Sequence, residues 1–419
     1  RLSLNEALIA NLTNVAERKR AMLEGLKVVE YASYIAAPGA GGIMADWGAD
    51  VIKVEPPGGD PIRMFFASVG IEGVALNPVF ELDNRGKRGV VLDTAQDAGR
   101  DALLRMIDGA DVFLTNVRPG GLKRAGLDHD ALMQRNPRLI YATLTGYGLE
   151  GPDADRPGMD SAAFWARSGL AALFRPKGGE PVQLRTAFGD HIASMAIVSG
   201  VLAALYERQH TGKGRLVEAA LLRVAHYAGG SDFAIQHSYG RTASNRPRKD
   251  APNPLINYFK TKDERWISLL TRQGEKDWPP LCRALKLEHL IADERFAKAK
   301  ARRANGPALV ALLDEAFAVR ALEEIAAALD AEEMIWAPVL SAAEAIVDPQ
   351  AIASGAVVQT PQADGTSINA PGAPIRFPGG DDGPKGPAPQ MGEHTRAVLL
   401  QYGYSEAEID ALYASGAAA

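Results

Sequence analysis

Short apolar runs alternate with helical patterns through the first third of the chain. Five runs rich in Val, Ile and Leu have the length of buried strands, and they cover 26–31, 50–55, 89–93, 111–115 and 138–144. Between the runs the apolar residues follow helical spacing, most clearly over 98–110. Strands that alternate with helices are typical of a parallel sheet covered on both faces. The pattern therefore predicts an α/β fold.

Two helix termini carry clear signals. A long helix is expected over 191–210, because Thr211-Gly212 follows it as a stop signal. Near the end of the chain, Ser405 and Glu408 form a capping-box pattern that predicts a last helix, with Ile409 and Leu412 on its buried side.

The organisation of the chain changes after Gly229. A polar stretch with several arginines leads to Pro252 and Pro254, and a β pair (255–259 and 265–270) and Ala-rich helices follow. A chain of 419 residues exceeds what one compact core normally holds. We therefore predict a second, smaller α+β domain over 235–340.

Composition and charge exclude several classes of protein. The net charge of −5 gives no reason to expect nucleic acid as a partner. A single cysteine, Cys282, excludes an intramolecular disulfide framework and suits a reducing compartment. The seven histidines show no metal-binding spacing, and no apolar run is judged long enough to span a membrane. We expect a cytoplasmic globular protein without a metal site or membrane anchor.

The stretch 158–169 places one carboxylate, Asp160, where a loop becomes an apolar helix. Turn-forming residues precede it, and no acid follows through Ala166. A carboxylate at a helix start usually caps that helix, which contributes ~1 kcal/mol. A carboxylate beside apolar walls is also typical of a covalent nucleophile. Both roles are open for Asp160 at this point.

Glycine and basic residues near the predicted strand ends indicate which ligands fit the sheet. Gly39-Ala40-Gly41-Gly42 begins like a dinucleotide fingerprint, but Met44 stands where its third glycine is required. Basic residues that suit a phosphate-bearing ligand such as coenzyme A (CoA) lie in successive loops; they are Arg85, Lys87, Arg88, Arg118, Lys123 and Arg124. Taken alone, these basic residues fit a solvated surface equally well.

Several motifs together resemble the class III CoA-transferase family, which also contains the 2-methylacyl-CoA racemases. The matching segments cover nearly the whole chain; they include 25–30, 45–60, 84–88, 116–120, 136–141, 145–148, 157–160, 200–214 and 392–395. The resemblance implies a Rossmann-like large domain built from 1–234 and 341–419, a small domain between them, and two chains interlocked as a homodimer.

The resemblance also implies a chemistry. Asp160 falls on the family's catalytic aspartate, which attacks an acyl-CoA thioester, forms a mixed anhydride and then carries CoA as an aspartyl thioester. The acyl-CoA and a free carboxylic acid are the substrates, and no cofactor is bound permanently. Six residues fall on positions that line the family's CoA site; they are Lys87, Asn116, Val117, Arg118, Arg124 and Tyr147.

Three departures from the family pattern narrow this expectation. Ile35 stands where formyl-CoA transferases carry Gln, and 246–251 replaces their glycine-rich flap, so formyl-CoA and oxalate chemistry is not expected. Met159 precedes Asp160 where the racemases have His, which favours a transferase. Racemisation needs two bases, so His129 and His191 are the candidates for a second base in that alternative. The third alternative is a non-catalytic CoA-binding protein.

Overall fold

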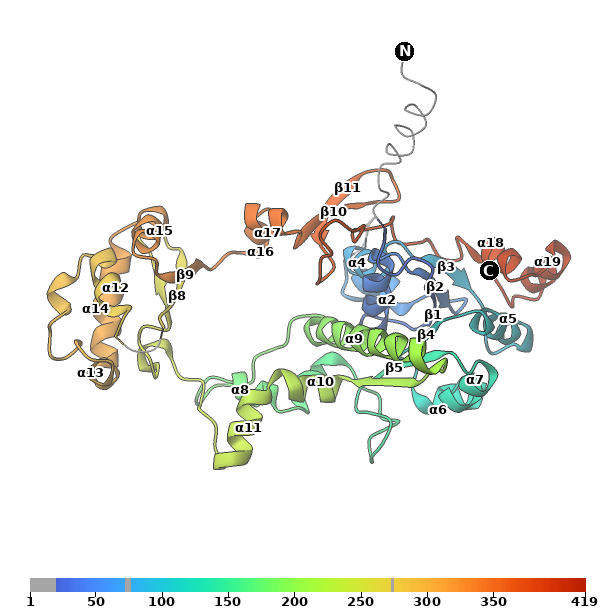
Figure 1. The fold of residues 1–419 in the computed structure, drawn as a ribbon, viewed down its shortest axis with the longest axis horizontal. Coiled ribbons are helices and arrows are strands. Elements are labelled where there is room, and N and C mark those ends of the chain that lie inside the picture. Colours follow the sequence, from blue (N-terminus) through green and yellow to red (C-terminus); the bar gives the residue numbers. More distant parts are fainter. Residues whose placement is uncertain (1–19, 72–76, 273–274) are drawn as a thin grey trace, which may run out of the picture. The chain divides into compact units, whose positions relative to one another are not determined.

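The computed structural model describes residues 20–71, 77–272 and 275–419 (Figure 1). Its contacts divide the chain into two compact units. Unit 1 runs to Ala171, resumes over Gln183–Gly240 and ends with Ile346–Ala419, and unit 2 comprises Ala172–Val182 and Arg241–Ala345. The domains 1–234, 235–340 and 341–419 stay a prediction, because compactness alone does not show that a unit folds independently.

A six-stranded parallel sheet forms the centre of unit 1. Its strands are β1 (Lys27–Tyr31), β2 (Asp50–Glu55), β3 (Arg88–Val91), β4 (Val112–Thr115), β5 (Ile140–Thr145) and β6 (Leu216–Ala220). They are arranged in the order β3-β2-β1-β4-β5-β6, and every neighbouring pair is parallel. The predicted α/β class with a parallel sheet is confirmed. β6 was not predicted, because Glu218 and two alanines give it a weak strand signal.

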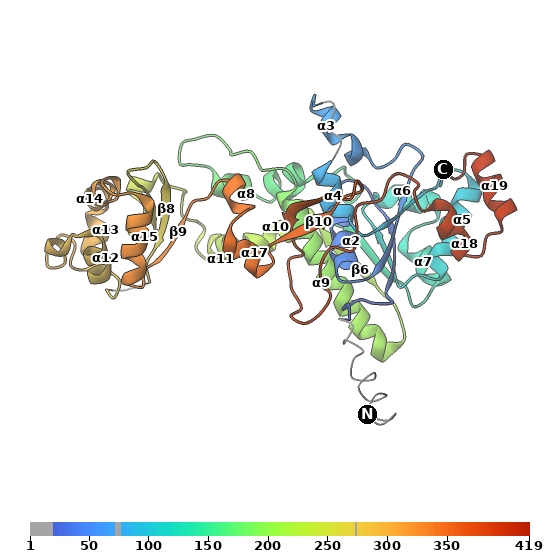
Figure 2. The same ribbon diagram turned by 90° about the horizontal axis from the view of Figure 1, so that it is seen from above.

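Helices cover both faces of this sheet (Figures 1 and 2). One face carries α2 (Ala36–Asp46) and α9 (Phe188–Thr211), and α4 (Pro78–Asn84) packs against α2. The larger apolar core lies on the other face, where helix side chains meet the strands. The helices around that core are α5 (Asp97–Asp108), α6 (Pro119–Ala125), α7 (His129–Arg135), α18 (Thr395–Gln401) and α19 (Glu406–Ala414). The predicted capping box starts α19, with Ile409 and Leu412 buried.

Helix α9 is unusually apolar for its length. Its 24 residues include a window of mean hydropathy 1.5, so by length and composition it could cross a membrane, contrary to the expectation from the sequence. One such helix is weak evidence for a span, because a core helix meets the same test. In this structure α9 packs against α2, β5 and β6.

The remaining elements of unit 1 connect or flank these layers. They are η1 (Pro61–Met64), α3 (Phe65–Ser68), the short π-helix η2 (Asp160–Ala166), α10 (Leu221–Ala228), α11 (Gly230–Tyr239), α17 (Pro349–Ser354) and the antiparallel pair β10 (Val357–Pro361) and β11 (Ser367–Pro371). Helix α8 (Leu170–Phe174) begins in unit 1 and ends in unit 2.

Unit 2 has its own core and an antiparallel sheet. The strands are β7 (Asn257–Lys260), β8 (Trp266–Leu270) and β9 (Ile335–Pro338), in that order. The first two match the predicted β pair, whereas β9 lies just beyond the predicted helices. The helices around its core are α12 (Trp278–Leu285), α14 (Gly306–Ala318) and α15 (Leu322–Ala331), and the shorter helices are η3 (Arg248–Asp250), η4 (Glu288–Leu290), α13 (Ala299–Ala304) and α16 (Ala342–Ala345).

Candidate active site

A cavity of about 870 Å³ opens in unit 1 at the carboxyl ends of the parallel strands. Its walls include Ser33–Ala36 after β1, Asn116–Pro119 after β4 and Thr145-Gly146 after β5, and the loop that leads to Asp160 closes one side. Ligands of open α/β sheets bind outside the carboxyl ends of the strands. The cavity therefore lies where the fold places its ligands.

Short hydrogen bonds fix the loops around the cavity. The Asn116 side chain accepts from the Ser33 N–H at 3.0 Å and donates to the Ser33 carbonyl at 2.7 Å. Tyr34 has a φ of +64°, and its N–H donates to the Asp60 carboxylate at 3.0 Å. A non-glycine residue at positive φ is held there by its surroundings and is most common at functional sites.

Two glycines bring the Asp160 loop against the end of β5. A Cβ on Gly158 would lie 2.6 Å from the Gly146 Cα, and one on Gly146 would lie 2.7 Å from the Gly158 Cα. Neither position has room for a side chain. This backbone contact sets the place at which Asp160 enters the cavity.

Asp160 does not cap the helix that it begins. The cap residue of η2 is Met159, which makes no side-chain cap hydrogen bond. Instead, the Asp160 Oδ2 accepts the N–H of Gly189, in the first turn of α9, at 3.0 Å. Gly189 is buried against Phe164 of η2, where an added Cβ would lie 2.4 Å from the Phe164 Cγ. The carboxylate thus lies at the N-terminus of a 24-residue helix, where the helix dipole stabilises negative charge.

Burial makes Asp160 more basic than an ordinary aspartate. Asp160 is only 8% exposed, and this loss of solvent contact raises the pKa of its carboxyl group. Hydrogen bonds from the N–H groups of Gly189 and Asp190, together with His191, lower the pKa but do not cancel that effect. A carboxylate with raised basicity is a better nucleophile, and its oriented N–H donors hold it in place.

A second carboxylate, Asp190, lines the same cavity and was not identified from the sequence. Burial, then the charge of Asp160, raises the pKa of Asp190 to about 7. The next residue, His191, has its Nε2 3.1 Å from the Oδ1 of Asp83 on α4. Burial lowers the pKa of His191, but the bond to Asp83 and the nearby carboxylates raise it above its ordinary value. The acid directly before the predicted helix 191–210 was the only sequence signal for Asp190.

Three of the six residues expected to contact CoA line the cavity. They are Asn116, Val117 and Arg118, all in the loop after β4. Arg124 is exposed on α6, and Tyr147 lies against Gly158 with the guanidinium of Arg156 5.8 Å from its ring. Arg156 and Arg185, which the sequence analysis did not single out, line the cavity as well.

Lys87 lies away from the cavity, inside an ion network. Its ammonium group donates to the Glu30 carboxylate at 2.7 Å, the Pro38 carbonyl at 2.8 Å and the Asn84 side chain at 2.9 Å. These three acceptors use all three N–H donors of a lysine. Its side chain is fully buried and does not line the cavity, and its contact with CoA stays a prediction.

The two histidines considered as second bases lie in different surroundings. His129 begins α7, its ring centroid is 6.0 Å from that of Tyr141, and it does not line the cavity. His191 is near enough to act electrostatically on Asp160.

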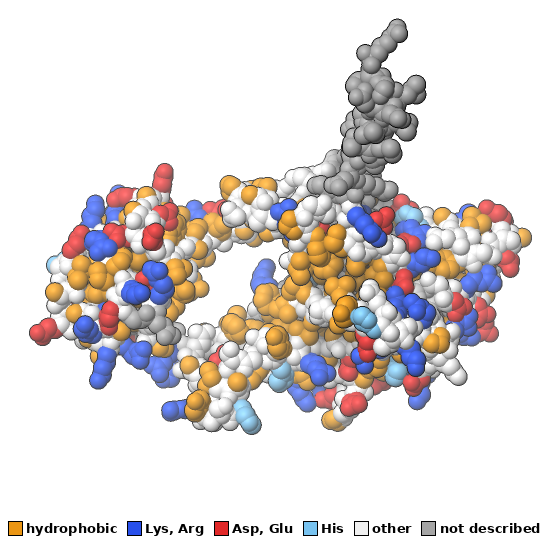
Figure 3. Space-filling model, in the orientation of Figure 1, with side chains coloured by type: hydrophobic (Ala, Val, Ile, Leu, Met, Phe, Trp, Pro, Cys, Tyr) orange, Lys and Arg blue, Asp and Glu red, His pale blue; other side chains and the backbone are white. Residues whose placement is uncertain are grey.

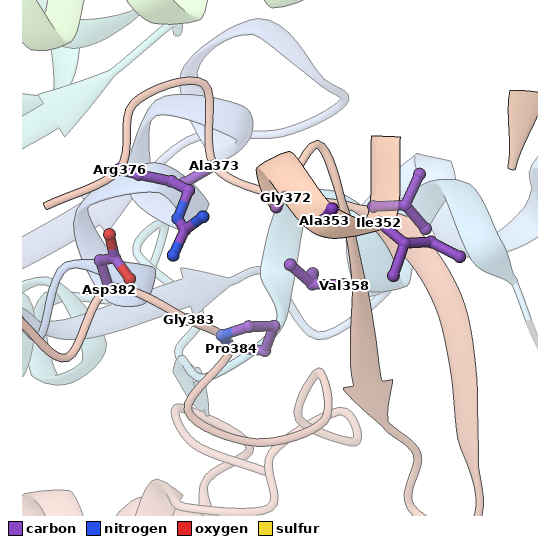
Figure 4. Close-up of a pocket in the computed structure, with 11 residues that line it drawn as sticks. Ile352, Ala353, Val358, Gly372, Ala373, Arg376, Asp382, Gly383 and Pro384 are labelled. Atoms are coloured by element: carbon purple, nitrogen blue, oxygen red, sulfur yellow. The ribbon is translucent and has the colours of Figure 1, made fainter. Parts of the chain in front are cut away.

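A second cavity, of about 230 Å³, lies beside β10 and β11 (Figure 4). Its charged lining residues are engaged with the chain: the Arg376 Nη1 donates to the Ser354 carbonyl at 3.1 Å, and the Asp382 carboxylate accepts the Phe377 N–H. It contains none of the residues singled out from the sequence. Over residues 20–71, 77–272 and 275–419, no cluster of His, Cys, Asp and Glu could hold a metal ion.

The chain matches a known protein family along most of its length. Residues 23–395 match the family model described as CoA-transferase family III, so the chain belongs to this family. It is a class III acyl-CoA:carboxylate CoA-transferase, an enzyme that moves CoA between acyl-CoA thioesters and carboxylic acids. The resemblance read from the sequence motifs is confirmed.

Known relatives cover the chain almost end to end. It is 34% identical over 392 residues to the (R)-2-hydroxy-4-methylpentanoate CoA-transferase of Clostridioides difficile, covering 93% of this chain and 97% of that protein. It is 32% identical over 402 residues to the cinnamoyl-CoA:phenyllactate CoA-transferase of Clostridium sporogenes, covering 94% and 97%. The crystal structure of a CAIB/BAIF family protein from Brucella suis superimposes with a TM-score of 0.81 at 30% identity, covering 92% of this chain and all of that one.

Proposed function

We propose that Asp160 is the nucleophile of this CoA-transferase. Its carboxylate oxygen attacks the thioester carbonyl carbon, the carbon–sulfur bond breaks, and CoA leaves as a thiolate while an acyl–aspartyl anhydride forms. The thiolate then attacks the Asp160 carbonyl carbon and releases the acid as a carboxylate. An acceptor acid runs the same steps in reverse, so the negative charge is conserved throughout and one difficult exchange becomes two easier ones.

The position of Asp160 at the start of α9 is the observation that carries this proposal. The N–H of Gly189 and the helix dipole favour negative charge at the Asp160 carboxylate. They would also favour the oxyanion that forms when the CoA thiolate attacks the Asp160 carbonyl carbon. The low exposure of Asp160 limits contact of the anhydride with water, which would hydrolyse it.

We place the phosphates of CoA against Arg118 and Arg124, and the rest of CoA along Asn116, Val117 and Tyr147. The support is the position of the β4 loop at the cavity. Among the described residues Arg118 has no ion-pair partner, so its planar guanidinium is available to a phosphate.

The acyl group is proposed to derive from a monocarboxylic acid with an apolar side chain. Ile35, Ile62, Phe65 and Ala187 line the cavity and belong to, or pack against, one apolar cluster. Two relatives are named for (R)-2-hydroxy-4-methylpentanoate and for cinnamoyl-CoA and phenyllactate, each of which carries a branched or an aromatic group. Ile35 in particular offers no hydrogen bond to a polar acid such as oxalate.

We propose a homodimer in the cytoplasm. Figure 3 shows hydrophobic side chains gathered on the face of unit 1 that carries α9 and α10, and Met195, Tyr206 and Tyr227 are exposed on these helices. Exposed apolar patches of this kind mark interaction sites. Sedimentation at several protein concentrations tests the dimer, and a monomer at all of them would contradict it.

CoA exchange with a panel of acyl-CoAs and free acids, followed by mass spectrometry, tests the proposed function. We expect exchange with branched or aromatic acids, loss of exchange in Asp160→Ala with CoA binding kept, and full exchange in the control Asp232→Ala on α11. Near-normal turnover of Asp160→Ala would contradict the nucleophilic role.

A racemase that acts on 2-methylacyl-CoA is the second candidate, and His191 near Asp160 is the observation that favours it. A transferase leaves the α-hydrogen untouched, whereas a racemase must exchange it. We expect no deuterium at the α-carbon of a 2-methylacyl-CoA incubated in deuterated water without an acceptor acid. Rapid exchange above the enzyme-free control would show racemase activity and direct attention to His191.

A further inference from the structure

Two carboxylates line one cavity, yet the chemistry proposed above uses only one. Asp160 enters the cavity from η2, and Asp190 enters it from the first turn of α9. The Gly189 N–H, one residue before Asp190, is bound to Asp160, so the two carboxyl groups are held in the same small region by the backbone. Like charges this close disfavour double ionisation.

The charges that act on Asp190 come from three elements. Asp160 on η2 and Asp83 on α4 oppose its ionisation, and His191 beside it on α9 favours it. The other elements packed against α9 are α2, β5, β6 and α10. Helix α2 has no charged residue before Asp46, and β5 has none at all.

The remaining charged groups of those elements lie in β6 and α10. Glu218 of β6 accepts the Leu149 N–H, and α10 contributes Arg223 and His226. Arg185 lines the same cavity from the loop before α9. Asp190 has no basic ion-pair partner among the residues that the structure describes.

We propose that Asp190 is a positioning residue that acts in its protonated form, in which Asp160 is the single negative carboxylate the enzyme contributes to the cavity. This inference rests on Asp160 being the nucleophile. The neutral form of Asp190 removes a charge that would repel the incoming carboxylate when the acceptor acid approaches the Asp160 thioester. The proton of Asp190 is not transferred, because every group exchanged in the reaction is an anion before and after its step.

The raised pKa of Asp190, about 7, agrees with this role and sets the pH range of the effect. Below this pH the carboxyl is neutral, and above it the carboxylate repels the acid. The Michaelis constant (KM) for the acceptor acid should therefore rise as the pH passes neutrality, with kcat affected less. One close charge corresponds to a change of roughly tenfold.

The variant Asp190→Asn imitates the neutral carboxyl and tests the proposal. Exchange is measured from about pH 6 to about pH 9 with the same acyl-CoA and acid in every variant, so that substrate ionisation cancels. We expect Asp190→Asn to match the native enzyme at low pH and to lose the alkaline rise in KM. An unchanged alkaline rise, or an equal loss of activity at all pH values, would overturn the proposal.

Two further variants separate this effect from its neighbours. His191→Gln should keep the alkaline rise in KM. If His191→Gln loses this rise and Asp190→Asn keeps it, the effect belongs to His191 instead. Asp190→Glu, for use if the Asn variant does not fold, should move the rise along the pH axis, and an unmoved rise would contradict the proposal. Failure of the nucleophilic role would be distinct, since Asp160→Ala would then retain exchange.

Discussion

Unit 1 contains two groups of buried charges that differ in how well they are satisfied. In the first, around Lys53, the ammonium group donates to Glu30 at 3.1 Å, Asp60 at 2.8 Å and the Ala32 carbonyl at 3.3 Å. Burial lowers the pKa of Lys53, but Glu30, Asp60 and Glu55 raise it above its ordinary value. Opposite charges alternate, and this network lies behind the loops that form the cavity.

The second group, around Asp160, brings like charges together. It contains Asp83, Asp160 and Asp190 with one imidazole, His191, and the buried Oδ2 of Asp83 has no hydrogen-bond partner within the described chain. Fully satisfied buried networks stabilise a fold, whereas strongly perturbed groups in a cleft mark functional sites. The comparison separates the charges that hold the candidate site in place from those to which we assign its chemistry.

The largest effect should come from breaking the satisfied network. Lys53→Met leaves Asp60 buried without its cationic partner and leaves Glu30 with Lys87 alone, and we expect a loss of roughly 3–5 kcal/mol of unfolding free energy. The exposed pair Arg100–Asp97 is the control, because Arg100→Met should cost under about 1 kcal/mol. Denaturant unfolding measures both, and equal losses would contradict the structural role of the network.

A methyl group at Gly189 should directly disturb the second group of charges, around Asp160. Gly189→Ala pushes Phe164 and the first turn of α9 apart, so we expect about 1–3 kcal/mol of destabilisation and roughly 100-fold slower exchange. Gly230→Ala is the matched control, because no atom lies within 4 Å of its added Cβ. Normal exchange in Gly189→Ala would show that Asp160 does not depend on this contact.

CoA binding should sharpen the assignment of the basic residues. Arg118→Ala should weaken CoA affinity by roughly 1–3 kcal/mol, since a charge-assisted hydrogen bond is lost. Arg124→Ala should weaken it less, because Arg124 does not line the cavity. Calorimetric titration with CoA measures both, and unchanged affinity in both variants would move the phosphate site elsewhere.

The smallest effect should be a gain in stability when the charge of Asp190 is removed from the group around Asp160. The pKa of Asp190 rises to about 7 on folding, so ionised Asp190 destabilises the folded protein. This destabilisation is absent below the pKa of the unfolded chain and grows until the pH reaches about 7. Asp190→Asn should therefore be more stable than the native protein at pH 8 and almost equally stable near pH 4. A destabilised variant at pH 8 would contradict the unsatisfied character of this group.

The sequence predicted those features that local patterns determine. The apolar runs of β1 to β5 have a simple periodicity, and the capping box at Ser405 involves residues three apart. Strand β6 was missed because Glu218 breaks the apolar pattern, although the strand completes the sheet through its pairing with β5.

The residues that surround the cavity could be predicted only in part, because their arrangement in space depends on packing. Asp160 could be found because its surrounding motif is local. Asp190 could not, because only the packing of η2 against α9 brings it to Asp160. Lys87 was assigned to CoA because its basicity is visible in the sequence, whereas the direction of its side chain, toward Glu30, depends on the fold.

Trapping the covalent intermediate tests most directly whether the group around Asp160 performs the chemistry. The enzyme is incubated with an acyl-CoA without an acceptor acid, digested under mildly acidic conditions and analysed by mass spectrometry. We expect one peptide, the one that contains Asp160, to gain the mass of CoA less one water. An adduct on Asp190 or elsewhere, or none in an enzyme that exchanges CoA, would contradict this assignment.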